Sequence, residues 1–297
     1  MNGTCEPRSN AQSSDGRPSA PPLPAIAMLG VGSMGGAILA GLRGPGVRVD
    51  GPIAVTTRSA ASAARFDGAS DVRAYAGESD DHANKRAVRG ARIVLLGVKP
   101  WMIHDLLREI AGDLEPGAVV VSVAAGVTIG SMEALLPEGV AVVRAMPNTP
   151  AHIGRGVTGI AGGSAASPDD LGLVRRLFET VGSVLVVDEG QINAITAISG
   201  SGPAYLFLYA EQMTAAARRL GFDEDQASLL VQQTIAGSAE LMVRSDEDPA
   251  QLRRNVTSPK GTTERAVEVL EAADWGELFD RALAANIRRS EELEAGS

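Results

Sequence analysis

A glycine-rich junction near the start of the chain constrains the fold more than any other feature. The stretch AIAMLGVGSMGGAILAGL predicts a short apolar strand from Ala25 to Leu29, a glycine turn, and a helix directly after it. Gly30, Gly32 and Gly35 stand there in G-x-G-x-x-G spacing. The first glycine permits a tight turn, the second lets a pyrophosphate approach the backbone, and the third lets helix and strand pack closely. The alternative is that these glycines only make a turn.

The segments that follow favour the dinucleotide site, because they repeat the strand and helix pattern. Further strands are expected at 52–58, 93–98, 118–124, 141–150, 156–162 and 184–187, with a helix at 168–182. Nearly continuous apolar strands that alternate with helices indicate a parallel sheet covered on both faces. Ligands of such sheets bind beyond the carboxyl ends of the strands, where Val98, Lys99, Pro100 and Ala125 are expected.

The end of the second strand bears on the choice of cofactor. NAD-preferring proteins tend to place an acidic residue there, which accepts hydrogen bonds from the ribose hydroxyls. Here the chain reads Thr56, Thr57, Arg58 and Ser59. An arginine and hydroxyl groups suit a 2′-phosphate better than a free diol, so we expect NADPH, with NADH as the alternative. Arg58 could instead be an ordinary surface arginine.

After Asp188 the pattern changes to helices, which are expected at 189–198, 203–221, 223–245 and 248–256, with a final helix from about 274. The SGSGP stretch is expected to interrupt the chain between the first two of these helices and to place its serine hydroxyls near a substrate. Tyr205, Leu206, Leu208 and Tyr209 present more apolar surface than a small helical layer hides, which indicates a subunit partner. We therefore expect an α/β fold: a disordered tail at 1–23, an N-terminal Rossmann-type dinucleotide-binding domain at 24–188, and an all-helical dimerisation domain at 189–297.

Composition excludes several classes of partner. The chain has 297 residues and a net charge of −9, which argues against nucleic acid or an anionic membrane. Cys5 is the single cysteine, and His82, His104 and His152 are scattered, so neither a disulfide within the chain nor a metal site is expected. No stretch resembles a signal peptide or approaches the roughly 20 apolar residues of a membrane span, so we expect a cytoplasmic protein.

A second helix start resembles an anion site. In NVTSPKGTTERAVEVLE the apolar residues fall at helical spacing from residue 266 onward, and the helix is predicted to begin near Thr262. The first N–H groups of a helix have no partner within it and lie at the positive end of the helix dipole. The alternative is that Thr262 and Thr263 only cap the helix.

The motifs GVGSMGG, GVKP, SVAAGVTI, RAMPNTP, ISGSGPAY and NVTSPKGTT occur here in the order and spacing of a known family. From about Ile26 to the C-terminal region the chain resembles pyrroline-5-carboxylate reductase. The resemblance implies an enzyme that reduces 1-pyrroline-5-carboxylate to L-proline with NAD(P)H, the last step of proline biosynthesis. It also implies an active site between the dinucleotide-binding domain and helical domains that interlock in a homodimer, which can belong to a higher homo-oligomer.

The same resemblance assigns roles to individual residues. The cofactor-binding positions are Gly30, Val31, Gly32, Ser33, Met34, Arg58, Ser59, Asn84, Val98, Lys99, Pro100, Ala124 and Ala125. The substrate positions are Asn255, Ser258, Gly261, Thr262 and Thr263, and Asn255 could also touch the cofactor. Thr263 is expected near the ring nitrogen of the substrate, and Glu189 nearby is expected to favour positive charge there. Lys260 stands where the family commonly has glycine; it has no assigned role, and its backbone is expected to avoid glycine-only angles.

Other functions stay open. A related hydroxy-acid dehydrogenase uses a lysine base on the first long helix of its second domain, but the only lysines here are Lys85, Lys99 and Lys260. A related imine reductase is another alternative. A non-catalytic NADPH-binding regulator is disfavoured by the SPKGTT corner, since a sensor of the cofactor alone needs no second anion pocket.

Overall fold

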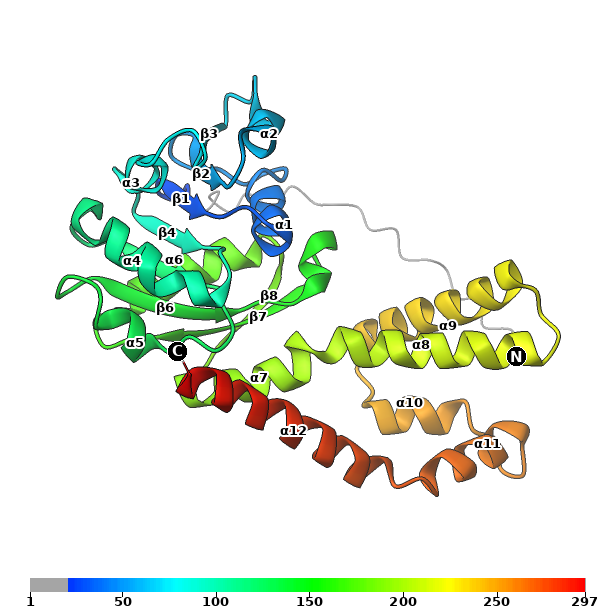
Figure 1. The fold of residues 1–297 in the computed structure, drawn as a ribbon. Helices are drawn as coiled ribbons and strands as arrows, with labels where there is room; N and C mark the ends of the chain where they lie inside the picture. Colours follow the sequence, from blue (N-terminus) through cyan, green and yellow to red (C-terminus); the bar gives the residue numbers. More distant parts are fainter. Residues whose placement is uncertain (1–20, 297) are drawn as a thin grey trace.

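The structure is a computed structural model that describes residues 21–296. Its N-terminal part is an eight-stranded sheet in the order β3-β2-β1-β4-β5-β6-β7-β8, with helices on both faces. Its C-terminal part is an arm of helices that projects from one side of the sheet domain (Figure 1). This confirms the predicted fold class, while the division of the chain at residue 188 stays a prediction.

The strands follow the apolar runs of the sequence. They are β1 (Ile26–Leu29), β2 (Ile53–Thr57), β3 (Val72–Ala76), β4 (Ile93–Leu96), β5 (Val119–Ser122), β6 (Ala141–Met146), β7 (Gly156–Gly162) and β8 (Gly182–Val186). Strands β1 to β6 are parallel, β7 is antiparallel to β6, and β8 is parallel to β7. Only β3 was not expected: it is a short edge strand whose second residue, Arg73, is exposed. Its apolar pattern is therefore too weak to predict.

Two hydrophobic clusters form on the two faces of the sheet. On one face α1 (Ser33–Leu42) and α6 (Pro168–Glu179) pack on side chains such as Met28 and Leu95. On the other face α3 (Ala83–Val88), α4 (Ile103–Ile110) and α5 (Ile129–Glu133) pack on neighbours such as Leu29 and Leu96. Because both faces of the strands are buried, the sequence shows apolar runs instead of alternation.

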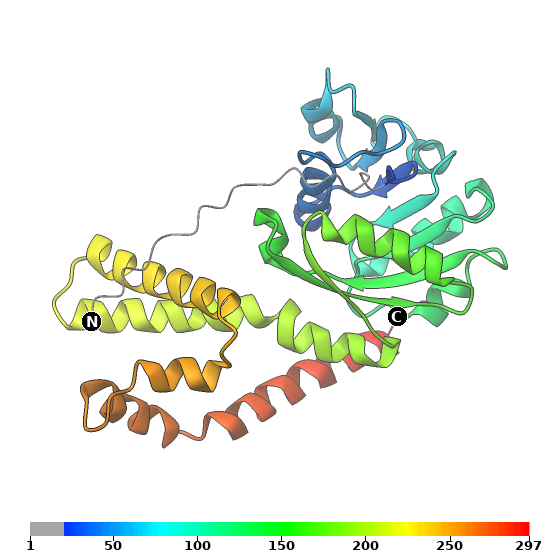
Figure 2. The ribbon, with the colours of Figure 1, turned by 180° about the vertical axis from the view of Figure 1, so that it is seen from behind.

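The helical arm begins after β8. It contains α7 (Ile192–Ile195), α8 (Gly202–Arg219), α9 (Glu224–Arg244), α10 (Pro249–Asn255), α11 (Thr262–Glu271) and α12 (Trp275–Ala295). Helices α8 and α9 lie side by side, and α12 runs back to the sheet domain (Figures 1 and 2). The expected break at SGSGP is instead a π-helical turn, Thr196–Gly200, that leads almost directly into α8. The Ser201 N–H donates to the Thr196 carbonyl at 2.8 Å, which keeps the helix path continuous.

A buried arginine fixes α12 to the sheet. Arg144 on β6 is only 1% exposed, and its guanidinium lies 2.8 Å from a carboxylate oxygen of Glu294 and 3.4 Å from one of Glu189. The Asn193 side chain donates to Glu294 at 3.1 Å. A buried cation needs such partners, since an unpaired one is strongly destabilising. The cluster therefore joins β6, the segment before α7, and the end of α12.

The start of the ordered chain differs slightly from expectation. Most of the predicted disordered tail, residues 1–20, lies outside the described residues. Leu23, which was assigned to that tail, is buried, and its N–H donates to the Arg48 carbonyl at 2.8 Å. Leu23 therefore packs with the sheet domain, while the tail boundary at residue 23 stays a prediction. Within residues 21–296, no helix combines the length and the apolar character that crossing a membrane requires.

Candidate nucleotide and substrate site

The glycine turn after β1 has the geometry that its sequence predicts. Gly30 has φ +88°, and a Cβ there would lie 2.8 Å from Val98 Cγ1. A Cβ on Gly35 would lie 2.8 Å from the Gly30 carbonyl oxygen, so helix α1 can pack this closely only with glycine. The Gly30 N–H donates to the Thr56 carbonyl at 3.2 Å and thereby holds the turn against β2.

Gly32 differs from the other two glycines of the motif, because a Cβ on it would point into open space. A Cβ on Gly32 would meet no atom within 4 Å. Gly32 is the N-cap of α1, no side chain caps this end, and the first turn carries no acidic residue. The first amides of α1, at Ser33 and Met34, are therefore open to an anion. These features fit the pyrophosphate of a dinucleotide.

The end of β2 fits an additional phosphate. Arg58 is exposed and pairs with no carboxylate in the described part of the chain. Ser59 caps α2 (Ala60–Ala63), because its hydroxyl accepts the Ser62 N–H at 3.3 Å. A free guanidinium beside a helix start can receive a 2′-phosphate.

The other expected cofactor positions lie at the same edge of the sheet, with one difference. Val98 to Pro100 follow β4, and Ala124 and Ala125 follow β5, so both groups lie at the carboxyl ends of neighbouring parallel strands. Asn84, in the first turn of α3, instead donates its side-chain N–H to Glu109 at 3.0 Å. That contact occupies one of the two donors of the amide.

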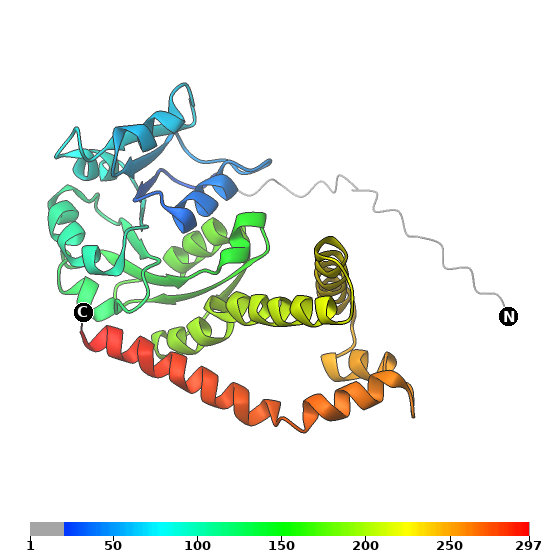
Figure 3. The same cartoon turned by 45° about the vertical axis from the view of Figure 1, so that its right-hand side comes forward.

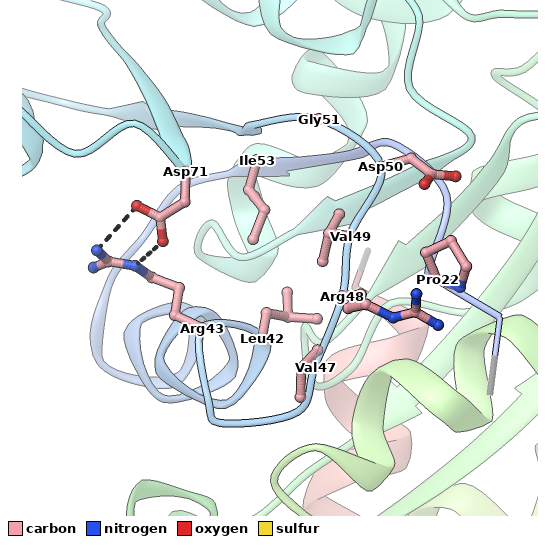
Figure 4. A pocket seen from close by; sticks show the side chains of 10 residues that line it. All are labelled: Pro22, Leu42, Arg43, Val47, Arg48, Val49, Asp50, Gly51, Ile53 and Asp71. Carbon is pink, nitrogen blue, oxygen red and sulfur yellow. Dashed lines mark hydrogen bonds and ion pairs between the residues drawn. The ribbon is translucent and has the colours of Figure 1, made fainter. Parts of the chain in front are cut away.

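A cavity of about 470 Å³ lies at the opposite edge of the sheet, at the end of α1 and the start of β2 (Figure 4). It is lined by Pro22, Leu42, Arg43, Val47, Arg48, Val49, Asp50, Gly51, Ile53 and Asp71. The hydrogen bonds from Arg43 lower the pKa of Asp71 below its usual value. None of the predicted site residues lines this cavity, and ligands of parallel sheets bind at the other edge.

The second helix start also has no side-chain cap, but Glu264 stands in its first turn. Helix α11 begins at Thr262 as predicted, but its N-cap is Gly261 and no side chain caps it. The alternative that the threonines only cap the helix is therefore wrong. The Gly261 N–H donates to the Ser258 carbonyl at 2.9 Å, which closes a tight corner, and both threonines are exposed.

Lys260 contradicts the expectation about its backbone. Its φ is +60°, in the left-handed region that favours glycine. The Lys260 N–H donates to the Glu264 carboxylate at 2.8 Å, which holds the residue in this conformation. Its side chain is exposed and pairs with no carboxylate among residues 21–296.

Within one chain, the two helix starts do not form a single site. The glycine turn lies in the sheet domain, whereas the α10–α11 corner lies at the far end of the helical arm in all three views (Figures 1, 2 and 3). Asn255 beside the corner donates its side-chain N–H to Glu247 at 2.7 Å. Within one chain, the glycine turn and the α10–α11 corner therefore lie in different parts of the molecule.

Glu189 lies with the sheet domain and not with the corner. Its Oε1 accepts the Ile129 N–H at 2.7 Å and faces Arg144 at 3.4 Å. Ile129 begins α5, just after the expected cofactor segment at Ala124 and Ala125. In this chain the Glu189 carboxylate therefore braces the loop after β5.

The arm leaves much apolar surface uncovered. On α8, Leu206, Phe207 and Leu208 are exposed, and Leu208 retains 57% of its accessible surface. Neither α8 nor α11 contains a buried residue. Exposed apolar faces of this extent mark a protein interface.

Two family models match the chain. The one described as pyrroline-5-carboxylate reductase dimerisation matches residues 189–293, and the one described as NADP oxidoreductase, coenzyme F420-dependent, matches residues 25–126. The pyrroline-5-carboxylate reductase of Pseudomonas aeruginosa is 38% identical over 271 residues, which cover 91% of this chain and 97% of the relative. The chain belongs to the pyrroline-5-carboxylate reductase family.

Solved structures agree with this assignment. A pyrroline-5-carboxylate reductase from Coxiella burnetii is 38% identical, with a TM-score of 0.83 over 90% of this chain and 97% of that one. The Plasmodium falciparum pyrroline carboxylate reductase with NADP bound is 25% identical, with a TM-score of 0.77 over 91% of this chain and 98% of that one. Like the family's dimerisation domain, the uncovered arm of this chain is built to pair with a second copy.

Sequence reasoning missed two residues that contact expected site residues: Arg144 faces Glu189, and His152 faces Ser33. Arg144, inside a strand, gave no signal that it holds α12, because its partners are far along the chain. His152 was treated as one of three scattered histidines, yet it contacts Ser33 on the glycine turn. The sequence feature that could have indicated this contact is the position of His152 shortly after the end of β6, since ligands of such sheets bind beyond the carboxyl ends of the strands. In the described residues, no group of three metal-ligating side chains comes together.

Proposed function

We propose that this protein reduces 1-pyrroline-5-carboxylate to L-proline by hydride transfer from NAD(P)H, with NADPH preferred. Family membership supports the activity, and the free Arg58 supports the preference. The observation that carries the proposal is the uncapped start of α11 at Gly261, with its exposed threonines. A cofactor sensor would not need this second anion site.

The active site combines two chains. One chain contributes the glycine turn and strand ends of residues 24–188, and the α10–α11 corner comes from the 189–297 domain of its partner. Support comes from the distance between the two halves within one chain and from the uncovered α8 face (Figure 1). The protein is accordingly a homodimer or a higher homo-oligomer, and as a chain with one cysteine it works in the reducing cytoplasm.

The corner binds the carboxylate of the substrate. The first amides of α11 and the Ser258 hydroxyl donate to it, and the helix dipole adds about 0.3–2 kcal/mol. This placement fixes the C=N carbon of the ring beside the nicotinamide. Bound NAD(P)H supplies the hydride that the carbon accepts.

The nitrogen of the ring must hold a proton as the carbon is reduced. Thr263 places its hydroxyl near this nitrogen, where it can hold and orient the proton. We assign Glu189 a supporting role, because its carboxylate already accepts the Ile129 N–H and faces Arg144. It positions the loop that follows β5, and its negative charge favours positive charge on the ring nitrogen.

The test compares two variants of one residue. Thr263→Ala should lower kcat/KM for pyrroline-5-carboxylate by about 10- to 100-fold, whereas Thr263→Ser, which keeps the hydroxyl, should retain most of it. Equal kcat/KM for Thr263→Ala and the wild type would reject the role of Thr263. If the wild type binds NADPH but does not oxidise it on addition of pyrroline-5-carboxylate, the protein is a regulator instead.

A further inference from the structure

A histidine outside the expected site contacts the phosphate-binding turn. His152 Nε2 lies 3.1 Å from the hydroxyl oxygen of Ser33, although the two residues are 119 positions apart in the sequence. Ser33 is the first residue of α1 and directly follows the open Gly32. Both side chains are exposed, so the pair borders the space where a pyrophosphate would lie.

The segment that carries His152 is held firmly in place. His152 belongs to the short helix Thr149–Ile153, which follows β6 and packs on α1. Asn148 before it is buried, donates to the Ser199 carbonyl at 3.0 Å and accepts the Val157 N–H at 2.9 Å. Ala151 is buried in the core beneath. The imidazole is therefore presented from a rigid support.

We infer that His152 is a positioning residue for the cofactor, which holds the Ser33 hydroxyl as a hydrogen-bond donor to the pyrophosphate of NAD(P)H. When His152 Nε2–H donates to the Ser33 oxygen, the hydroxyl proton of Ser33 is free to point at a phosphate oxygen. The donor then adds to the amides of Ser33 and Met34 at the same helix start. The first turn of α1 carries no acidic residue to compete for it.

This inference rests on the proposed use of NAD(P)H but not on the proposed substrate. The test measures the Kd of the whole protein for NADPH by fluorescence titration. His152→Leu should weaken binding by about tenfold or more, as expected for one hydrogen bond to a charged group. His152→Gln, whose side-chain amide can still donate to Ser33, should restore most of the affinity.

A double-mutant cycle separates positioning from direct contact. Ser33→Ala should weaken NADPH binding to a similar extent, and His152→Leu should have no further effect in the Ser33→Ala background. Adenosine 2′-monophosphate, which lacks a pyrophosphate, should bind equally to all these variants. As a control, Arg89→Ala, which removes an exposed ion pair with Asp113, should bind NADPH like the wild type.

Several results would overturn the inference. These are an unchanged Kd in His152→Leu, an additive loss in the double variant, or an equal loss for adenosine 2′-monophosphate. A lower Tm in His152→Leu with unchanged NADPH affinity would mean that the contact only stabilises the fold. A wild type that binds NADPH but reduces no pyrroline-5-carboxylate would remove the proposed function and leave this inference standing, while one that does not bind NADPH would remove both.

Discussion

Gly32→Ala should abolish cofactor binding while leaving the fold intact. The backbone at Gly32 has φ −82° and ψ −154°, which alanine also adopts, and its Cβ would meet no atom within 4 Å. Replacing glycine stabilises by about 0.4–1 kcal/mol through the unfolded chain, and alanine is a poorer N-cap by a similar amount. The free energy of unfolding should therefore change by less than about 1 kcal/mol.

The effect on binding should be much larger. The new methyl group would occupy the space through which the pyrophosphate reaches the amides of Ser33 and Met34. Two hydrogen bonds to a charged group are worth about 1.5 kcal/mol each at the low end, so their loss raises the Kd by more than about a hundredfold. The Kd comes from NADPH fluorescence titration and the stability from thermal unfolding.

Gly35→Ala is the matched control for this reasoning. Its Cβ would lie 2.8 Å from the Gly30 carbonyl oxygen, so it should lower the free energy of unfolding by about 1–3 kcal/mol. If Gly32→Ala bound NADPH within threefold of the wild type, the pyrophosphate would not lie at this turn. If Gly32→Ala instead unfolded as readily as Gly35→Ala, a Cβ at Gly32 would clash with the protein and would not face open space.

Three further predictions concern single residues. Lys260→Gly should raise the free energy of unfolding by about 0.5–1 kcal/mol, because relief of the left-handed backbone exceeds the entropy that glycine adds to the unfolded chain; thermal unfolding would contradict this if the variant were less stable. Burial opposes ionisation of Asp170, but hydrogen bonds from Arg92 and Ser167 outweigh it and lower its pKa below 3.8. The ionised Asp170 therefore stabilises the folded protein fully above the ordinary carboxyl pKa, and this contribution is lost as the pH falls through the lowered value. Asp170→Asn should lower the free energy of unfolding by about 1–3 kcal/mol at pH 7, and by progressively less below about pH 4, as measured by acid unfolding. Arg58→Ala should weaken NADPH binding by about tenfold or more and leave NADH binding unchanged, and an equal loss for both cofactors would remove Arg58 from the 2′-phosphate site.

Most of the sheet could be predicted from the sequence, because strands buried on both faces leave apolar runs that few other structures produce. Strand β3 could not, since its edge position allows Arg73 to face solvent. The π-helical turn before α8 was also missed, because serines and glycines usually predict a break. Here the Ser201 N–H finds its acceptor five residues back and continues the helix.

The two candidate anion sites could be predicted from the sequence, but their separation within one chain could not. The glycine spacing and the SPKGTT corner each mark a helix start, which is a local property of the sequence. Whether two helix starts face each other depends on the direction of the arm, and on contacts such as Arg144 with Glu294 that join distant segments. The left-handed backbone of Lys260 was predicted wrongly, because a lysine side chain disfavours this conformation. The available signal was that the family commonly has glycine at this position.

The central claim, that each active site combines two chains, can be tested directly with mixed dimers. Gly32→Ala and Thr263→Ala are coexpressed with different affinity tags, and doubly tagged dimers are assayed for NADPH oxidation by pyrroline-5-carboxylate. If the halves come from different chains, one site of the mixed dimer has both halves intact. Activity should then return to about half that of the wild type, while each parent retains about a tenth of the wild-type activity or less. No activity above that of the parents, in mixed dimers that still bind NADPH, would contradict the account.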